Sequence, residues 1–518
     1  MELMKNHVAV YKRENEAFTQ MTVDEDYNVP DHCEDVGRLI QHQGRVQIED
    51  VKVSESRVFI TGTLCFKVLF AVDQEPNLMA SLEGSVPFEE SMNVKGISSG
   101  EKICLRWDLE DLNIQLIHSR KMNIRALVAF TAVQEVEKDI SFTSDLRKNG
   151  VSQKKEKIQV LGLHVHNRDT IRIRDTFVLS SNKPDIDKLV WDSLDVRGIH
   201  VRMEEGRTIV KGEVFAFFLY EDDTESDALQ WLEYSLPFQK ELICEGCTQD
   251  MIPEMDITVI NTSLTVKPDS DGEERMIQVD LLMESDLKVY KEEQIDLLLD
   301  IYHSSCRLVP EMESVLAERL LIKNYAKCRI QERVTIDHNT GRILQICHSE
   351  GVVRIEESRM IEHGIQVEGF VQIQVLYVTG MDEMPFYSVE TMVPFSVKVE
   401  APGIDEACRW YLHGELEQLS TTMSDGSAID VKAFINLNAL VLRSQTVENI
   451  VNVRMEELDV DYYKKIPGIV GYVVQPNDTL WDIAKRFCTT VDQIKMVNQL
   501  NDDKIKPNDI LILLKEVQ

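Results

Sequence analysis

The chain has 518 residues, 43% of them hydrophobic and 28% charged, so it is too long for one hydrophobic core and too apolar for wholesale disorder. A formal net charge of -33 argues against nucleic acid or anionic lipid as the main partner, because proteins that neutralise phosphates carry a basic excess. The ten cysteines lack the density of a disulfide framework, and we expect reduced thiols that serve as small core residues.

Residues 1–15 are charged throughout and contain no apolar segment of signal-peptide length. No later stretch approaches the roughly 18 consecutive apolar residues that span a bilayer. We therefore expect a cytoplasmic protein that is neither exported by a signal peptide nor integral to a membrane.

One template occurs three times along the chain. In each copy a glycine is followed after seven and eight positions by Leu and an aromatic residue, and after 25 positions by a Pro-Phe pair. A glutamate lies four positions before each Pro, and a second glycine lies nine positions after it. The first glycines are 150 and 157 residues apart, so the unit is a domain rather than a solenoid repeat. The markers are Gly62, Leu69, Phe70, Glu83, Pro87, Phe88 and Gly96; Gly212, Leu219, Tyr220, Glu233, Pro237, Phe238 and Gly246; and Gly369, Leu376, Tyr377, Glu390, Pro394, Phe395 and Gly403.

Apolar residues alternate with polar ones around each first glycine, as in a strand with one buried face. The glycine itself lies on the apolar face, which indicates a β-bulge or the close approach of another strand. Further alternating runs cover residues 46–53, 123–133, 276–283 and 429–442. Each repeat is therefore predicted to be an antiparallel sandwich or barrel.

The expected architecture is mainly β, with three tandem β-sandwich or barrel-like repeats followed by a small βααβ domain. The polar, basic segment 147–157 is predicted to link the first two repeats. The domains are expected at residues 1–148, 155–306, 310–458 and 470–516.

Two short motifs have chemical interpretations, but both coincide with the second glycine of the template. Cys244 and Cys247 form a C-x-x-C pair that could serve a zinc site or a redox dithiol, although neither a second ligand pair nor a βαβ context accompanies it. In the template they replace apolar residues, which favours core cysteines. Residues 96–100 match the G-x-S-x-G pattern of hydrolases, but the other copies lack the serine, which favours a chance match.

His164 and His166 fall on the same face of a predicted strand and could share a metal ion. The sequence suggests no third ligand nearby, so we interpret them as surface histidines. No pair of carboxylates has a spacing that indicates acid–base chemistry. We expect no catalytic residue, no metal site, no cofactor and no enzymatic activity.

After residue 468 the alternating pattern is replaced by a compact module. Residues 472–474 and 510–513 are predicted to form short strands. Thr479 and Thr490 occupy N-cap positions, with Asp482 and Gln493 three positions later as in a capping box. The expected order of elements is βααβ.

The module resembles the LysM family in its Tyr-x-Val opening, its Asp478–Ala484 stretch and its closing Ile505–Leu511 stretch. Asn477 and Asn508 stand where that family usually has glycine, and asparagine tolerates a left-handed turn. The resemblance implies a groove for N-acetylglucosamine chains, bordered by these two loops. The candidate binding face comprises Gln475, Pro476, Asp478, Leu480, Trp481, Lys504, Ile505, Lys506 and Asn508.

Three residues of this face have a second interpretation. Leu480 and Ile505 could instead belong to the module core, and Trp481 is expected at its rim, beside the buried stripe. The module has six Lys or Arg and seven Asp or Glu, a net of -1, which leaves -32 on the remainder of the chain. It is therefore the part best able to approach another acidic surface.

Three such repeats followed by one LysM module resemble the SipL-type spore-coat morphogenetic proteins of clostridial spore-formers, which are built from three SPOCS domains plus LysM. The resemblance implies a non-enzymatic adaptor in the mother-cell cytoplasm that binds the coat ATPase SpoIVA through LysM and helps the coat encase the forespore. A chain without an export signal also has little access to sugar polymers, which favours a protein partner. The alternative is a peptidoglycan- or cortex-binding protein that recognises N-acetylglucosamine polymers.

Overall fold

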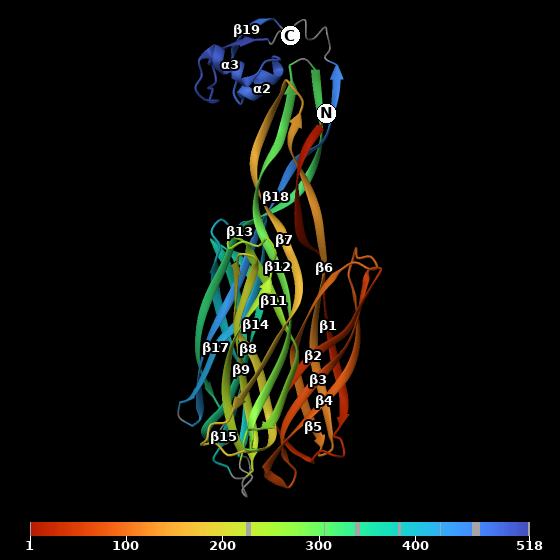
Figure 1. Cartoon of the computed structure of the whole chain (residues 1–518), viewed down its shortest axis with the longest axis vertical. Helices are drawn as coiled ribbons and strands as arrows, with labels where there is room; N and C mark the ends of the chain where they lie inside the picture. Colours follow the sequence, from red (N-terminus) through yellow and green to blue (C-terminus); the bar gives the residue numbers. More distant parts are fainter. Residues whose placement is uncertain are drawn as a thin grey trace.

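Figure 1 shows the chain, in a computed structural model, as an elongated molecule with a broad body, a narrower stalk and a C-terminal module at the stalk tip. The structure describes residues 2–223, 229–304, 306–336, 342–381, 385–424, 426–457 and 467–515. Within these ranges, every regular element before the module is a β-strand. The prediction of a mainly β chain is therefore confirmed.

Across the described residues, each repeat consists of six strands in two three-stranded antiparallel sheets. The orders β1-β6-β5 and β2-β3-β4 in the first repeat recur as β7-β12-β11 with β8-β9-β10, and as β13-β18-β17 with β14-β15-β16. The predicted alternating runs all lie within strands. The strands are β1 (Glu2–Asn28), β2 (Val36–Ser54), β3 (Arg57–Val72), β4 (Glu75–Asn93), β5 (Ile103–His118), β6 (Lys121–Arg147), β7 (Val151–Val178), β8 (Ile186–Glu204), β9 (Arg207–Asp222), β10 (Leu229–Ile243), β11 (Ile252–Pro268), β12 (Glu274–His303), β13 (Cys306–Thr335), β14 (Ile343–Ile361), β15 (Gly364–Thr379), β16 (Phe386–Glu400), β17 (Cys408–Met423) and β18 (Ala428–Glu457).

The first marker glycine of each repeat lies opposite the Phe of the Pro-Phe pair on the next strand. A Cβ on Gly62 would lie 2.7 Å from Phe88 Cζ, so the ring occupies the space that a side chain would need. The other neighbouring strand has a β-bulge at this level, between Ile48 and Asp50. Both the predicted bulge and the predicted close approach are confirmed. The cross-strand pairs are Gly62 with Phe88, Gly212 with Phe238, and Gly369 with Phe395.

The two residues of each Leu-aromatic pair lie in different cores, because neighbouring side chains on a strand face opposite sides of the sheet. The aromatic residues pack inside their own repeats: Phe70, Tyr220 and Tyr377. The leucines of all three repeats instead belong to one cluster: Leu69, Leu219 and Leu376. The sheets β2-β3-β4, β8-β9-β10 and β14-β15-β16 therefore meet through this leucine cluster, although the same faces also carry polar residues such as Lys67 and Gln374. The body is a pseudo-threefold assembly formed by a single chain.

A polar ring lies where strands β2, β8 and β14 approach one another. Gln43, Ser193 and Glu350 are 150 and 157 residues apart, so they are equivalent positions of the three repeats. The Gln43 amide and the Ser193 hydroxyl donate to the same Glu350 oxygen, Oε2, at 2.6 and 2.9 Å. The three repeats contribute different groups to the ring: an amide, a hydroxyl and a carboxylate. A chain with two of its repeats in exchanged positions would therefore leave a partly buried polar group without its partner.

The stalk consists of three two-stranded ribbons: residues 2–12 with 136–147, 151–161 with 292–303, and 306–318 with 444–457. A single ribbon of this kind is marginally stable in water. The three ribbons share an apolar cluster that includes Val8, Phe142, Ile158, Leu297 and Ala317. The stalk is therefore stabilised by contact between repeats rather than within any one of them.

The segment 147–157, predicted to be a linker, is instead a turn followed by the start of β7. Strand β6 ends at Arg147 and β7 begins at Val151, so only residues 148–150 connect the first two repeats. Lys154, Lys155 and Lys157 are exposed on a stalk ribbon, which needs polar residues on its solvent side. The prediction was wrong because a solvated strand and a linker have the same composition.

The C-terminal module has the predicted βααβ order. The side-chain oxygens of Thr479 and Thr490 each accept a hydrogen bond at 3.2 Å from the backbone amide three residues later, which confirms both N-caps. Asn477 and Asn508 both have a φ of 72°, the left-handed conformation expected at these two turns. The elements are β19 (Ile469–Val473), α2 (Leu480–Arg486), α3 (Val491–Asn498) and β20 (Ile510–Leu514).

Candidate functional site

One carboxylate of the stalk holds helix α2 of the module. Trp481 Nε1 donates to Asp300 Oδ2 at 2.8 Å, and Lys485 Nζ lies 2.8 Å from both oxygens of the same carboxylate. Trp481 and Lys485 are four residues apart and therefore lie on one helix face. The Tyr302 ring meets the indole edge-on, with 4.8 Å between centroids, and belongs to the module's core cluster. The indole expected at the rim of a binding face thus packs against β12.

Other residues of the predicted binding face have structural roles. Leu480 is buried in the module core and Ile505 packs partly buried against it, as the core interpretation expected. Asp478 accepts hydrogen bonds from the Tyr472 hydroxyl at 2.6 Å and from the Gln475 amide at 2.8 Å. The hydrogen bond from Tyr472 holds the pKa of Asp478 below its ordinary value. The carboxylate therefore braces the first loop.

The remaining predicted residues are exposed on two adjacent loops. The Val474 amide donates to the Asp509 carbonyl and the Asn508 amide donates to the Val474 carbonyl, both at 2.9 Å. These bonds hold the loop at residues 475–479 beside the loop at residues 504–509. The exposed residues are Gln475, Pro476, Lys504, Lys506 and Asn508.

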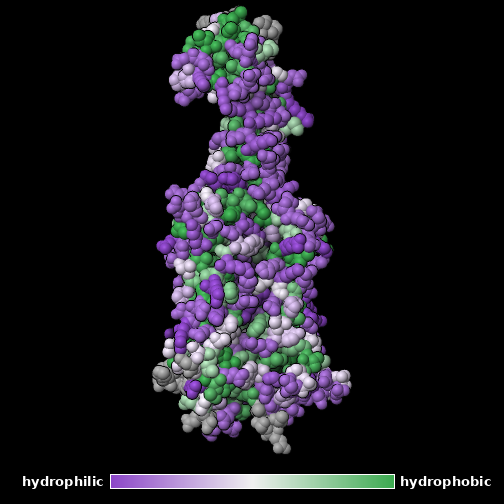
Figure 2. All heavy atoms as spheres, turned by 90° about the vertical axis from the view of Figure 1, so that its left-hand side faces the viewer, coloured by the Kyte–Doolittle hydropathy of each residue, from purple (hydrophilic) through white to green (hydrophobic). Residues whose placement is uncertain are grey.

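The outer face of the module's two-stranded sheet is apolar and exposed, and it was not among the predicted binding residues. Ile469 and Val473 of β19 and Ile510 and Ile512 of β20 are 70%, 44%, 73% and 48% exposed. In Figure 2 hydrophobic residues gather on the module, above a mostly hydrophilic stalk. The sequence contains one indication of this exposed face: every residue of β20 is apolar. A strand with helices on only one of its faces would otherwise alternate apolar and polar residues.

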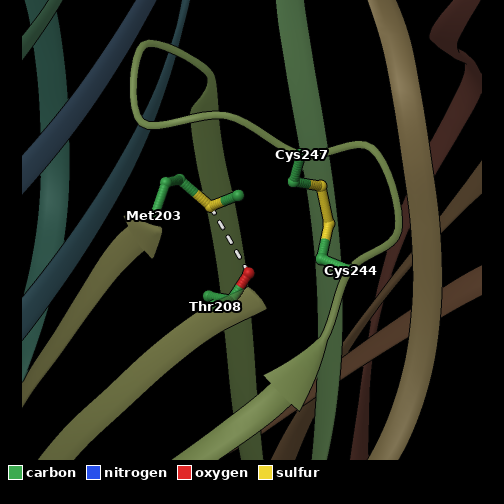
Figure 3. Close-up of a disulfide and its surroundings, with 4 residues drawn as sticks. All are labelled: Met203, Thr208, Cys244 and Cys247. Carbon is green, nitrogen blue, oxygen red and sulfur yellow. Dashed lines mark hydrogen bonds between the residues drawn. A yellow bond between two sulfur atoms is a disulfide. The ribbon is translucent and has the colours of Figure 1, made fainter. Parts of the chain in front are cut away.

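Cys244 and Cys247 form a disulfide in the turn after β10 (Figure 3), which corrects the expectation of reduced thiols at these positions. Gly246 has a positive φ, and the turn brings the two Cα atoms within 5.6 Å, a separation that a disulfide can bridge. Both cysteines are buried beside Met203, as core residues should be. The Thr208 hydroxyl donates a hydrogen bond to the Met203 sulfur at 3.4 Å. The other eight cysteines of the described chain are free.

The G-x-S-x-G match lies in the turn between β4 and β5. Gly96 and Gly100 have positive φ values, and the Ser98 amide donates to the Glu101 carboxylate at 2.8 Å. This segment joins two strands, whereas the hydrolase motif requires a turn between a strand and a helix.

His164 and His166 differ in their surroundings. His164 is exposed, but His166 is largely buried and bonded to Asp286 at 2.9 Å and to Glu137 at 2.8 Å. The hydrogen bond to Asp286, with that to Glu137, raises the pKa of His166 above its ordinary value. The interpretation of His166 as a surface histidine was therefore wrong, because strands of two repeats cover it.

Donor atoms of Glu135, His166 and Asp286 lie within 4.8 Å of one another, close enough to suggest a metal site. However, the buried Lys288 ammonium lies 3.1 Å from Asp286 and 3.6 Å from Glu135. Arg168 also bonds both carboxylates, at 3.0 and 3.1 Å. A divalent cation would have to enter against two positive charges. The cluster is better described as a charge-balanced joint between the first two repeats.

A half-open cavity of about 1350 Å³ in the body is lined by residues of all three repeats. Lys67 of the first repeat pairs with Asp192 of the second, and Arg354 of the third pairs with Asp108 of the first. Glu350 accepts the hydrogen bonds of the polar ring at the same wall. These lining charges join one repeat to another.

Among the helices of the described residues, none is long and apolar enough to cross a membrane. The family model of the SipL SPOCS domain matches residues 35–117, 185–267 and 342–424, and that of the LysM domain matches residues 472–513. Each SPOCS match covers the second to fifth strands of one repeat and leaves out the long strands that build the stalk. No curated protein and no solved structure matches the chain significantly.

Proposed function

Because this chain is a SipL-type protein, with three SPOCS domains followed by one LysM domain, we propose that it is a non-enzymatic adaptor for spore-coat assembly. In this proposal it acts in the mother-cell cytoplasm at the forespore surface. Its LysM domain binds the coat ATPase SpoIVA, and this attachment promotes encasement of the forespore by the coat. The three SPOCS domains and the stalk carry the LysM domain at one end of the molecule.

The observation that carries the proposal is the apolar outer face of the β19–β20 sheet. Ile469 and Ile510 are each more than two thirds exposed, and such clustered aliphatic side chains are typical of protein interfaces. A sugar polymer offers few apolar groups to cover them. Lys504 and Lys506 on the neighbouring loop add positive charge, which can steer the LysM domain toward an acidic protein.

Ile510→Glu in the full chain tests this surface, because the side chain is 73% exposed and the substitution should leave the fold intact. The matched control is Ile243→Glu on the body, where the side chain is 78% exposed. We expect Ile510→Glu to weaken binding to purified coat ATPase at least about tenfold, equal to about 1.4 kcal/mol. Ile243→Glu should bind as the unaltered chain does. Equal binding by both variants would remove the sheet face from the account.

A second candidate function is recognition of N-acetylglucosamine polymers, favoured by the LysM match itself. The adjacent loops that carry Pro476 and Asn508 then form the binding site. Isothermal titration of the full chain with an N-acetylglucosamine hexamer separates the two functions, because this candidate requires saturable heat that Asn508→Asp reduces while Ile510→Glu does not.

A further inference from the structure

We infer that Trp481 is a positioning residue, which latches the LysM domain onto the second repeat alone and so fixes the direction in which the exposed sheet face points. This inference rests on the proposed function only for its effect on partner binding. The latch consists of Trp481, Lys485, Asp300 and Tyr302. Its contacts are intramolecular, so its existence can be tested without any partner.

The pseudo-threefold stalk offers three equivalent places for such a latch. Each ribbon has a β-bulge at the same level. The residues directly after the three bulges are Asp145, Asp300 and Asn452, and they pair with Met4, Lys154 and Glu311, respectively. Because Met4, Lys154 and Glu311 are 150 and 157 residues apart, they are equivalent positions of the three repeats. A bulge re-aims the side chains that follow it. The central residue of each tripeptide after the bulge belongs to one shared cluster. The tripeptides are Asp145-Leu146-Arg147, Asp300-Ile301-Tyr302 and Asn452-Val453-Arg454.

Only the second repeat combines a carboxylate with an aromatic ring at this level. Asp300 provides an acceptor for the Trp481 indole and a counter-charge for Lys485, and Tyr302 provides a face for the indole edge. These groups suit the two side chains that α2 presents on one face.

The other two repeats lack this combination. The first repeat has a carboxylate, but Asp145 is paired with Lys155 at 3.1 Å and Arg147 stands in the place of Tyr302. The third repeat has the neutral Asn452, and its Arg454 lies 2.9 Å from Glu311. An arginine in the place of Tyr302 brings a positive charge toward Lys485, and like charges at short distance repel.

Chain connectivity does not explain the choice of repeat. The LysM domain follows β18, which belongs to the third repeat, yet its helix α2 docks on β12 of the second. The third repeat is the nearer one along the chain. Side-chain chemistry at the stalk tip therefore selects the docking position, and the sheet face remains exposed while the latch is closed.

The double variant Asp300→Asn/Tyr302→Arg gives the second repeat the residues of the third and leaves every LysM residue unchanged. We expect the LysM domain of this variant to leave the stalk. The α2 amides should then exchange hydrogen faster, and small-angle X-ray scattering should show a more flexible molecule than the unaltered chain. Binding to the coat ATPase should weaken about tenfold although the sheet face is intact. The matched control is Asp145→Asn in the first repeat, which should leave exchange, scattering and affinity unchanged.

Three results would overturn the inference. If α2 exchange and scattering do not change in the double variant, the latch does not hold the domain. If the released domain binds the ATPase as tightly as before, the latch does not position the sheet face for the partner. If it binds more tightly, the stalk covers a partner contact, and Trp481 is not a positioning residue. A failure of the proposed function can be told apart from a failure of this inference. If the unaltered chain does not bind the ATPase, the proposed function fails, and the exchange and scattering results alone decide whether the latch exists.

Discussion

Leu219→Ala is the substitution that most sharply tests whether the three repeats form one body. Leu219 is fully buried in the shared cluster with Leu69 and Leu376. Truncation removes three carbons from contact, worth about 2.5 kcal/mol at roughly 0.8 kcal/mol per buried carbon. An unfilled cavity adds to this loss, so we expect a total of about 3–5 kcal/mol. Because the cavity lies between repeats, protection should fall in β3 and β15 as well as in β9.

Hydrogen exchange read by mass spectrometry under native conditions provides the assay, and Leu281→Ala provides the matched control. Leu281 is also fully buried, but it lies in a core cluster of the second repeat. We expect Leu281→Ala to raise exchange mainly in the second repeat, whereas Leu219→Ala raises it in all three. If both variants give the same exchange map, the leucine cluster does not couple the repeats and the reasoning is refuted.

Three further substitutions test the joints between repeats and the marker glycine. Glu415 of β17 accepts a hydrogen bond at 2.8 Å from the Ile199 amide of β8, so it joins the third repeat to the second. Burial raises the pKa of Glu415 from its ordinary 4.5 to about 7, so the folded state loses stability as pH rises through this range. Glu415→Gln should therefore raise the free energy of unfolding in urea by about 1–2 kcal/mol at pH 8 and hardly at pH 4.5, and a pH-independent gain would contradict this cause. Arg13 of the first repeat lies 2.7 Å from Glu254 of the second and stacks 4.1 Å over the Tyr411 ring of the third, so it joins all three repeats. Arg13→Met should lower the free energy of unfolding by about 3–5 kcal/mol in the same assay, because it leaves the Glu254 carboxylate without its counter-charge. Adding Glu254→Gln should recover part of this loss. Gly62→Ala should lower the thermal midpoint of unfolding, because the added methyl group overpacks against Phe88 and lowers the free energy of unfolding by about 1–3 kcal/mol. The matched control is Gly471→Ala, whose methyl group would meet open space and should leave the thermal midpoint unchanged.

The fold of each repeat could be predicted because its signals are local. Alternation around Gly62 specifies a strand with a buried face, and the Pro-Phe pair 25 residues later supplies the ring that fills the space beside the glycine. Capping residues such as Thr479 likewise specify helix starts through bonds to amides three residues away. Physical causes that act within one strand pair or one helix turn are visible in sequence spacing.

The assembly of the repeats could not be predicted, because it depends on contacts between residues far apart in the chain. The Leu of each Leu-aromatic pair was recognised as a marker, but nothing local shows that Leu69, Leu219 and Leu376 meet. Lysines such as Lys155 gave a stalk strand the composition of a linker.

The candidate site was predicted in part for the same reason. Gln475 and Lys506 are exposed on adjacent loops, as a binding face requires. Trp481 was placed on that face because its helix position lies beside the buried stripe. The strand that covers it, with Asp300, comes from another domain and is not visible in the spacing of the module.

The measurement that tests the account most directly is the binding of the unaltered full chain to two ligands in one buffer. Purified coat ATPase and an N-acetylglucosamine hexamer are titrated separately, and both dissociation constants are determined by biolayer interferometry with the chain immobilised. The account predicts saturable binding of the ATPase and no measurable binding of the hexamer. Binding of the hexamer without binding of the ATPase would contradict it.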